Sequence, residues 1–449
     1  MLTVEAAADA LAQGRTTSRA LVEACLERIL DPGGQGARVF VRVYEANARE
    51  SADAWDSLRR AGRAPGRYAG IPISLKDLLD VAGEPTPAGS MVLADAPQAV
   101  AHAPVVERLL AAGLVPVGRT NMTEFAFSGV GINPHYGTPL APWDRATGRV
   151  PGGSTSGGAV SVADGMALAA IGTDTGGSCR IPAAFCGIVG FKPTQRRVPR
   201  DGVLPLSPTL DSVGPLAATV ACCAVIDAIL VGEPPARLPA WPPAGTRLLM
   251  PTNLVLDGMD AGTERAMDRV VQQLDRAGVV VHHRPLQVFD LIAQAHARGG
   301  FAVVEAYAIH RHLLASDGDR FDPRVASRIF PGAEMAAVDY IALLDARRRI
   351  IAAFAEELAP YDALIMPTVP IAPPPVAAFA DEGEYKRLNG LILRNSAQIN
   401  FVDGCAISIP CHEPGAPPAG LTLAAPAFSD RHLLTLAAAL ADLLGGDRT

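Results

Sequence analysis

The chain has 449 residues and a formal net charge of -7, with 49% hydrophobic and 19% charged residues. This length and composition allow a large buried core, and the acidic balance gives no basic surface for nucleic acid or an anionic membrane. No apolar run reaches bilayer-spanning length, and residues 1–15 lack the pattern of a signal peptide. We therefore expect a cytoplasmic protein without nucleic-acid or membrane partners.

Cysteine and lysine usage are both informative. The seven cysteines are odd in number, scattered and without CxxC spacing: Cys25, Cys179, Cys186, Cys222, Cys223, Cys405 and Cys411. This pattern favours reduced thiols over a disulfide framework or a metal site. Of the 39 basic residues only three are lysines, Lys76, Lys192 and Lys386. A lysine kept in so arginine-rich a chain is a candidate for reversible deprotonation, which arginine cannot perform.

The first sixty residues are predicted to be helical. Thr3 can cap a helix that ends at Gly14, and Thr17 or Ser18 can cap the next. From residue 69 on, short apolar runs alternate with helical stretches, a texture typical of βαβ units and a mostly parallel sheet.

The remaining predicted elements follow that alternation. The strands are expected at 69–77, 114–119, 166–173, 187–193, 247–250, 278–283, 362–370, 405–411 and 420–426. The helices are expected near 104–113, 157–167 and 262–277, with two more before about 359 and a closing helix over 429–444. Residues 129–158 are predicted to be a functional loop, and the Pro-rich stretch 232–247 a surface linker.

The densest chemical signal is a pair of glycine-serine segments, PGGSTSGG (151–158) and GTDTGGSCRIP (172–182). Glycines let backbone N–H groups approach a ligand, so a serine directly after Gly176 and Gly177 lies where such groups converge on an oxyanion. A phosphate-binding loop is the alternative, but no lysine follows the glycines as a P-loop requires. The chain also lacks a GxSxG elbow and an SxxK pair.

A nucleophilic serine needs a base. The nine histidines lie mostly in helices or variable segments, so Lys76 is the better candidate. Its neighbours are apolar: Ile73, Leu75, Leu78 and Leu79. Desolvation there would lower the pKa of the ammonium, and Ser154 is placed to relay a proton from Ser178. An exposed ion pair with Asp77 is the alternative, and the scarcity of lysine elsewhere weighs against it.

The joined pattern of Lys76, PGGSTSGG, GTDTGGSCRIPAAFCGIVGFKPT and PLSPTLDSVGPLA resembles the amidase-signature family. The likeness extends from the N-terminal helices to YDALIMPTVP and the closing AISIPC and PAGLTLAA segments. That family hydrolyses amides through a Ser–cis-Ser–Lys triad and an acyl-enzyme, without metal or cofactor. The resemblance implies an α/β fold, a large α/β/α sandwich with a mixed, mostly parallel central sheet.

The resemblance also assigns roles to residues. Ser178 matches the nucleophile, Ser154 the bridging serine whose preceding peptide is cis, and Lys76 the base. Further matches are the oxyanion-hole N–H groups of Thr175, Gly176, Gly177 and Ser178, the polar pair Asp174 and Arg180, and the loop glycines Gly152 and Gly153. The chain departs from the family pattern at Thr155, Ser156 and Cys179, and the spacing favours Ser154 over Ser156 as the bridge.

We expect one domain over residues 1–449. Its parts are N-terminal helices (1–65), a catalytic core (66–230), a variable section on the substrate side (231–360), and C-terminal strands with a closing helix (361–449). The pocket candidates are mostly apolar: Phe125, Phe127, Ile132, Tyr136, Phe330, Met335 and the loop 367–375. Such walls suit a small aryl or alkyl amide, an anilide or a carbamate (urethane), although each residue could instead belong to the core.

Two other functions remain open. The same family contains the A subunit of glutamyl-tRNA(Gln) or aspartyl-tRNA(Asn) amidotransferase, a glutaminase that places an acidic residue against the glutamine α-amine. This chain has Leu393 there, so a stand-alone amidase, monomer or homodimer, acting on a small molecule is preferred. The other alternative is a non-catalytic ligand-binding member of the fold, which would need no combination of Ser178, Ser154 and Lys76.

Overall fold

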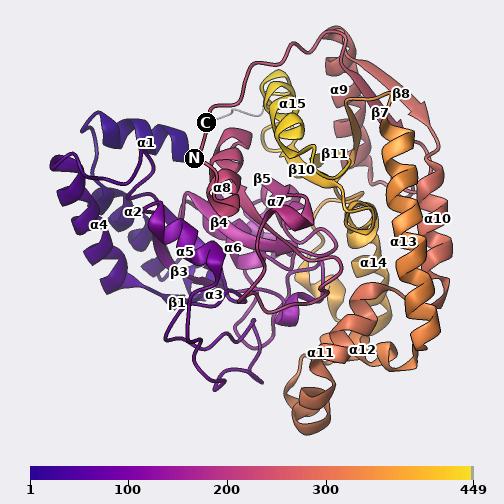
Figure 1. Ribbon diagram of the computed structural model, residues 1–449, viewed down its shortest axis with the longest axis horizontal. Coiled ribbons are helices and arrows are strands. Elements are labelled where there is room, and N and C mark those ends of the chain that lie inside the picture. The colour runs from indigo at the N-terminus through magenta and orange to yellow at the C-terminus, as the bar shows by residue number, and fades with distance from the viewer. Residues whose placement is uncertain (446–449) are drawn as a thin grey trace.

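One mixed sheet of eleven strands runs through the molecule, in the order β1-β3-β2-β4-β6-β5-β10-β11-β9-β7-β8 (Figure 1). The computed structural model describes residues 1–445. The strands are β1 (Phe40–Val43), β2 (Pro72–Lys76), β3 (Val115–Thr120), β4 (Ala169–Asp174), β5 (Val189–Lys192), β6 (Ser212–Ala217), β7 (Arg247–Pro251), β8 (Val280–Arg284), β9 (Ala363–Pro367), β10 (Cys405–Pro410) and β11 (Gly420–Ala425).

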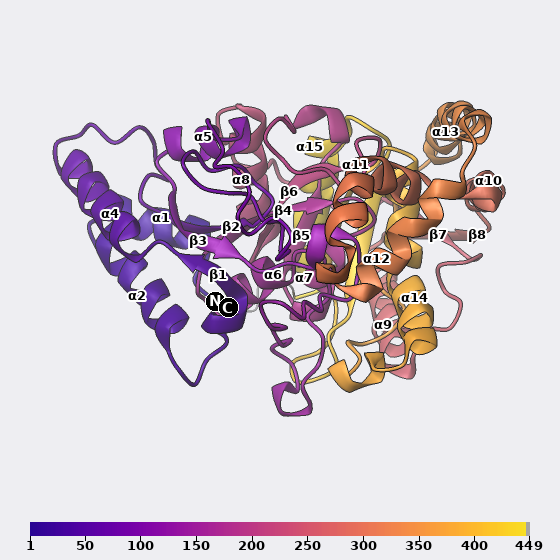
Figure 2. The ribbon, with the colours of Figure 1, turned by 90° about the horizontal axis from the view of Figure 1, so that it is seen from below.

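Helices cover both faces of this sheet. They are α1 (Val4–Ala12), α2 (Ser18–Leu30), α3 (Gly36–Val39), α4 (Glu45–Arg60), α5 (Pro104–Ala111), α6 (Ser156–Ala163), α7 (Arg180–Cys186), α8 (Val220–Val231), α9 (Ala261–Arg276), α10 (Gln287–Ala295), α11 (Phe301–Asp317), α12 (Pro323–Ile329), α13 (Ala337–Leu358), α14 (Glu382–Phe401) and α15 (Asp430–Leu443). Helices α8 and α15 pack together on one face, and α6 and α7 pack together on the other (Figure 2).

The predicted α/β sandwich with a mixed sheet is confirmed, but the expectation of mostly parallel pairing is wrong. Four of the ten strand pairings are parallel, and six are antiparallel. Helices bury both faces of the central strands, so even antiparallel strands have the continuous apolar sequence that is typical of parallel sheets. The apolar sequence of the buried strands therefore predicted where they lie but not whether they pair in parallel or antiparallel.

Local signals located several elements correctly. The side chain of Thr3 accepts a hydrogen bond from the amide of Ala6 and caps α1, and Thr17 caps α2 in the same way. Five elements were missed: the short strand β1 among the N-terminal helices, helix α7, strand β6, helix α8 and helix α14. Four helices, α10 to α13, occupy the region before residue 359 where two were predicted.

Candidate active site

The site begins at the carboxyl ends of two neighbouring parallel strands. Strand β2 ends at Lys76, and β4 ends at Asp174, immediately after Thr173. These strands pair in parallel, with Ile73 opposite Ala169, so their carboxyl ends reach the same edge of the sheet. This placement brings the lysine and the second glycine-serine segment together although about a hundred residues separate them.

Lys76 lies fully buried in a cluster of hydroxyl groups. Its Nζ donates to Ser154 Oγ at 2.8 Å, to Thr173 Oγ1 at 2.9 Å and to Thr155 Oγ1 at 3.0 Å. Burial lowers the pKa of Lys76 to about 8. The alternative of an exposed ion pair with Asp77 is excluded, because Asp77 is itself buried and accepts a hydrogen bond from Arg119 Nε at 2.9 Å.

The first glycine-serine segment is held against this cluster by close backbone packing. The peptide between Gly153 and Ser154 is cis, as the resemblance implied. A side chain at Gly153 would lie 2.7 Å from the amide nitrogen of Gly131, so only glycine fits there. The lysine contact goes to Ser154, whereas the buried hydroxyl of Ser156 has no hydrogen-bond partner among residues 1–445. The structure thus distinguishes the two serines.

A buried ion pair supports the loop that carries Ser178. Asp174 accepts hydrogen bonds from the amides of Gly177 (2.8 Å) and Cys179 (3.1 Å). Arg180 forms a two-point contact with the same carboxylate, at 2.8 and 3.0 Å. Burial alone would raise the pKa of Asp174, but the neighbouring Arg180 outweighs it and holds that pKa well below its usual range.

Asn400 completes this support and was not predicted as a site residue. Its Nδ2 donates to Asp174 Oδ1 at 2.9 Å, and its Oδ1 accepts from Arg180 at 2.6 Å. The residue lies on α14, a helix that was not predicted from the sequence. No local pattern marks Asn400, because its partners lie more than two hundred positions earlier in the chain.

Three of the four predicted oxyanion-hole amides are unengaged. Gly177 donates its N–H to Asp174, so this amide is already used inside the loop. For Thr175, Gly176 and Ser178, no acceptor of the backbone N–H occurs among residues 1–445. A bond from the amide of Thr155 to the carbonyl oxygen of Ser178, 3.3 Å long, joins this loop to the one that carries Ser154.

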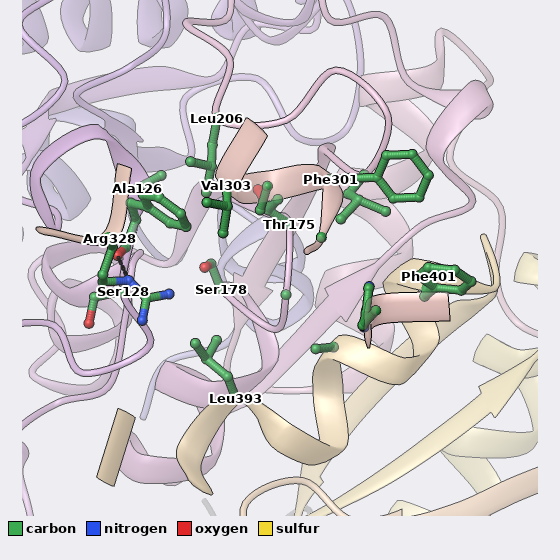
Figure 3. A pocket seen from close by; sticks show the side chains of 17 residues that line it. Ala126, Ser128, Thr175, Ser178, Leu206, Phe301, Val303, Arg328, Leu393 and Phe401 are labelled. Carbon is green, nitrogen blue, oxygen red and sulfur yellow. Dashed lines mark hydrogen bonds between the residues drawn. The ribbon is translucent and has the colours of Figure 1, made fainter. Parts of the chain in front are cut away.

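Ser178 lies at the wall of a cavity of about 330 Å³ (Figure 3). The wall is built mainly by α11, α12, α14 and the loops that end near residues 128 and 210. Its lining is largely apolar: Ala126, Phe127, Leu206, Leu210, Phe301, Ala302, Val303, Leu393, Ala397 and Phe401. The side chain of Ser178 lies among the residues that line this cavity.

Of the predicted pocket residues, only Phe127 lines this cavity. Phe125 instead stacks on the buried His310 at 4.2 Å, and Ile132 belongs to the core beneath α7 and α14. Phe330 is 52% exposed, and Tyr136, Met335 and the loop 367–375 do not contribute to the lining. An apolar residue that faces a cavity has the same sequence signature as one that faces the core, so the sequence could not separate these two positions.

The missed wall residues of α14 did carry a signal. Leu393, Ala397 and Phe401 follow one another at four-residue spacing, so they share one face of a helix. The spacing identifies a buried face, yet the cavity behind it depends on the neighbouring helix α11. That helix is separated from α14 by some sixty-five residues of chain.

Besides three hydroxyl-bearing residues, Ser128, Thr175 and Ser178, the side chains of Arg328 and His296 interrupt the apolar wall. Arg328 donates from Nε to the carbonyl oxygen of Phe127 at 3.0 Å, and its guanidinium lies 4.7 Å from the centre of that phenyl ring. His296 packs edge-on against Phe401 at 4.9 Å, and burial lowers the pKa of His296. At neutral pH the wall therefore carries one charge, on Arg328.

Among residues 1–445, no group of three or more His, Cys, Asp or Glu side chains is arranged to hold a metal ion. The same described residues include no helix both long and apolar enough to cross a membrane. All seven cysteines are buried and free.

The chain is similar to several known proteins. The family model described as Amidase matches residues 20–434. A 2-amino-5-chloromuconic acid deaminase from Comamonas testosteroni is 37% identical over 405 residues, covering 89% of this chain and 87% of that protein. The A subunit of the glutamyl-tRNA(Gln) amidotransferase of Chloroflexus aggregans is 35% identical over 468 residues, covering 96% of this chain and 94% of that protein.

A solved structure described as a crystal structure of amidase has a TM-score of 0.88 and 30% identity, covering 98% of this chain and 99% of that one. The family model and the relatives extend over almost the whole chain, including both glycine-serine segments and Lys76. This chain therefore belongs to the amidase family, the amidase-signature enzymes, and is a hydrolase of carbon–nitrogen bonds.

Proposed function

We propose that this enzyme hydrolyses a small, rather hydrophobic amide, anilide or carbamate through an acyl-enzyme on Ser178, with Ser154 as relay and Lys76 as base. The observation that carries the proposal is the contact from Lys76 Nζ to Ser154 Oγ, 2.8 Å long, within a buried cluster of hydroxyl groups. No carboxylate pairs with Lys76 among residues 1–445, so its low pKa makes a neutral amine accessible near neutral pH. We propose further that it acts as a cytoplasmic monomer or homodimer.

The reaction follows from these groups. Neutral Lys76 accepts the proton of Ser154, which accepts the proton of Ser178 as the Ser178 oxygen attacks the carbonyl carbon. The negative charge on the carbonyl oxygen is met by the free amides of Thr175, Gly176 and Ser178. The C–N bond breaks, and the amine leaves with the proton returned along the same relay. Water then hydrolyses the acyl ester by the reverse transfers.

The apolar lining supports a hydrophobic substrate and weighs against glutamine. None of the lining residues within the described part of the chain is acidic, and Leu393, the residue expected to be acidic in a glutaminase, is one of them. An α-ammonium group would therefore meet leucine in place of a carboxylate. One relative is named as a deaminase of 2-amino-5-chloromuconic acid, so deamination of such an acid is a second candidate reaction.

Labelling of the nucleophile tests the mechanism. A fluorophosphonate probe should modify the wild-type enzyme at Ser178 and leave Ser178→Ala unlabelled. Substitution of Ser178 or Ser154 by alanine should lower turnover by about a thousandfold or more. Ser156→Ala is the matched control, because it removes a neighbouring serine whose hydroxyl touches neither Lys76 nor another polar group. Near-normal turnover in Ser178→Ala would refute the proposal.

A substrate panel tests the specificity. We expect a nitroanilide and an aryl carbamate to be hydrolysed faster than a small aliphatic amide, and all three faster than glutamine. A preference for glutamine would favour the glutaminase alternative. Ammonia released from an amino-muconate in place of any amide cleavage would favour deamination.

A further inference from the structure

The residues that line the cavity beside Ser178 include one cationic side chain. Among these seventeen lining residues, Arg328 on α12 is the one arginine, and lysine, aspartate and glutamate do not occur. The remaining surface is mostly carbon, with the hydroxyls of Ser128, Thr175 and Ser178 and the ring of His296. A charge in so apolar a setting is costly unless an opposite charge meets it.

Arg328 has no carboxylate partner among residues 1–445. Its guanidinium uses Nε for the carbonyl oxygen of Phe127 and lies over the phenyl ring of that residue. The two terminal nitrogens have no acceptor within the described chain, and they point toward the side of the cavity where Ser178 lies (Figure 3). Desolvation lowers the pKa of Arg328, and the nearby Tyr385 hydroxyl opposes this shift only in part.

Arg324 on the same helix behaves differently. Its Nε lies 2.9 Å from Asp322 Oδ1, and its guanidinium is partly exposed to solvent. The two arginines lie one helical turn apart. Arg324 has a carboxylate partner near the surface, whereas Arg328 has none inside the cavity. The position of α12 alone therefore does not explain why Arg328 lacks a partner.

The charge of Arg328 and the backbone N–H dipoles both favour a negatively charged ligand in the cavity. Burial lowers the pKa of His296, so its ring stays neutral and does not oppose Arg328. The unengaged amides of Thr175, Gly176 and Ser178 present N–H dipoles at the other end. An anion is the complementary ligand, and the two free nitrogens of a guanidinium match the two oxygens of a carboxylate.

We propose that the substrate is an amide acid: a small molecule whose carboxylate binds Arg328 while its amide carbonyl lies at Ser178, with a hydrocarbon spacer against the apolar wall. The inference rests on the proposed function and specifies its substrate class. Leu393 on the same wall offers nothing to an ammonium group, so the acid carries no neighbouring amine.

Matched chromogenic substrates test this inference. Mono-4-nitroanilides of unbranched dicarboxylic acids of increasing length are compared with their methyl esters, which have the same shape and no charge. We expect the wild-type enzyme to have a kcat/KM about 10- to 100-fold higher for the acid of the best length than for its ester. Arg328→Gln should remove this preference, chiefly by raising KM for the acid, so that acid and ester are hydrolysed with similar kcat/KM. Arg324→Gln, on the same helix, should keep the preference.

Binding to the Ser178→Ala protein, measured by calorimetry, gives a readout without turnover. The acid should bind more tightly than the ester, and the additional Arg328→Gln change should abolish the difference. Arg328-dependent binding without any hydrolysis by the wild-type enzyme would contradict the proposed function and support the inference. Equal hydrolysis of acid and ester, or an equal loss of both in Arg328→Gln, would overturn the inference and leave the proposed function standing.

Discussion

The two sides of Ser178 differ in how their polar groups are satisfied. On the interior side, Lys76 reaches three hydroxyl groups, and Asp174 is held by Arg180, Asn400 and two backbone amides. On the cavity side, the wall is apolar and its one charge has no carboxylate partner among the described residues.

We infer that the interior side of Ser178 serves the chemical reaction and that the cavity side determines which substrate binds. A fully bonded network has one stable arrangement, so it holds the base and the loop of Ser178 in place before any substrate arrives. An unpaired charge in an apolar wall gains its partner only when a ligand binds.

The largest effect is expected from Lys76→Arg. The positive charge remains but cannot be released near neutral pH, so the serine relay loses its proton acceptor and kcat should fall about a thousandfold. Lys386→Arg, at an exposed lysine paired with Glu382, is the control for the exchange itself. Thermal unfolding of both variants should confirm that they fold. Near-normal turnover in Lys76→Arg would refute the role of a neutral amine.

The second-largest effect is expected from the loss of Arg180, and it should appear as a lower free energy of unfolding. In Arg180→Met the carboxylate of Asp174 remains buried without its cation, and the free energy of unfolding should fall by about 3–5 kcal/mol. Arg145→Met, which breaks a partly exposed ion pair with Asp164, should cost about 1 kcal/mol or less. Urea unfolding measures both. Equal costs in the two variants would mean that the interior network is no more tightly coupled than the surface.

The dependence of kcat/KM on pH should report the deprotonation of Lys76. Burial lowers the pKa of Lys76 to about 8, so the ammonium form dominates below that pH and cannot accept a proton. We expect kcat/KM to rise about a hundredfold from pH 6 to a plateau above pH 8. The profile is measured with a neutral anilide, whose own charge does not change in this range. A flat profile from pH 6 to 8 would contradict the assignment.

His310, behind Phe125, should make the fold sensitive to acid. Both of its ring nitrogens are buried without a hydrogen bond among the described residues, and burial lowers the pKa of His310 from 6.5 to about 4. Between these values the unfolded chain binds a proton that the folded chain does not, so stability falls as the pH falls through this range. His310→Leu should reduce the stability lost between pH 7 and 4.5 by about 2 kcal/mol. Parallel losses in both proteins would disprove this role.

The smallest effect is expected at Leu393. A carboxylate introduced by Leu393→Asp would compete for Arg328 and repel an acidic substrate, lowering kcat/KM for the acid anilide about tenfold. The ester should be affected less. Leu393→Asn is the matched control, because it has the same size without the charge. An equal loss with aspartate and asparagine would trace the effect to packing.

Much of the chemistry of this protein could be predicted from local stretches of its sequence. Ser178, Ser154, Asp174 and Arg180 lie in two short segments whose residue order carries the pattern, and the apolar neighbours of Lys76 were enough to predict its burial. Such signals are local, because a glycine turn or a buried strand depends mainly on the residues within it.

The strand directions and the wall of the cavity depended instead on tertiary packing. Phe127 and Arg328 lie about two hundred positions apart, as do Asp174 and Asn400. Whether an apolar side chain faces the core or a cavity, and whether an arginine has a partner, depends on which distant segments pack beside it. The sequence of one segment contains no record of that packing, so the substrate pocket became visible only in the folded chain.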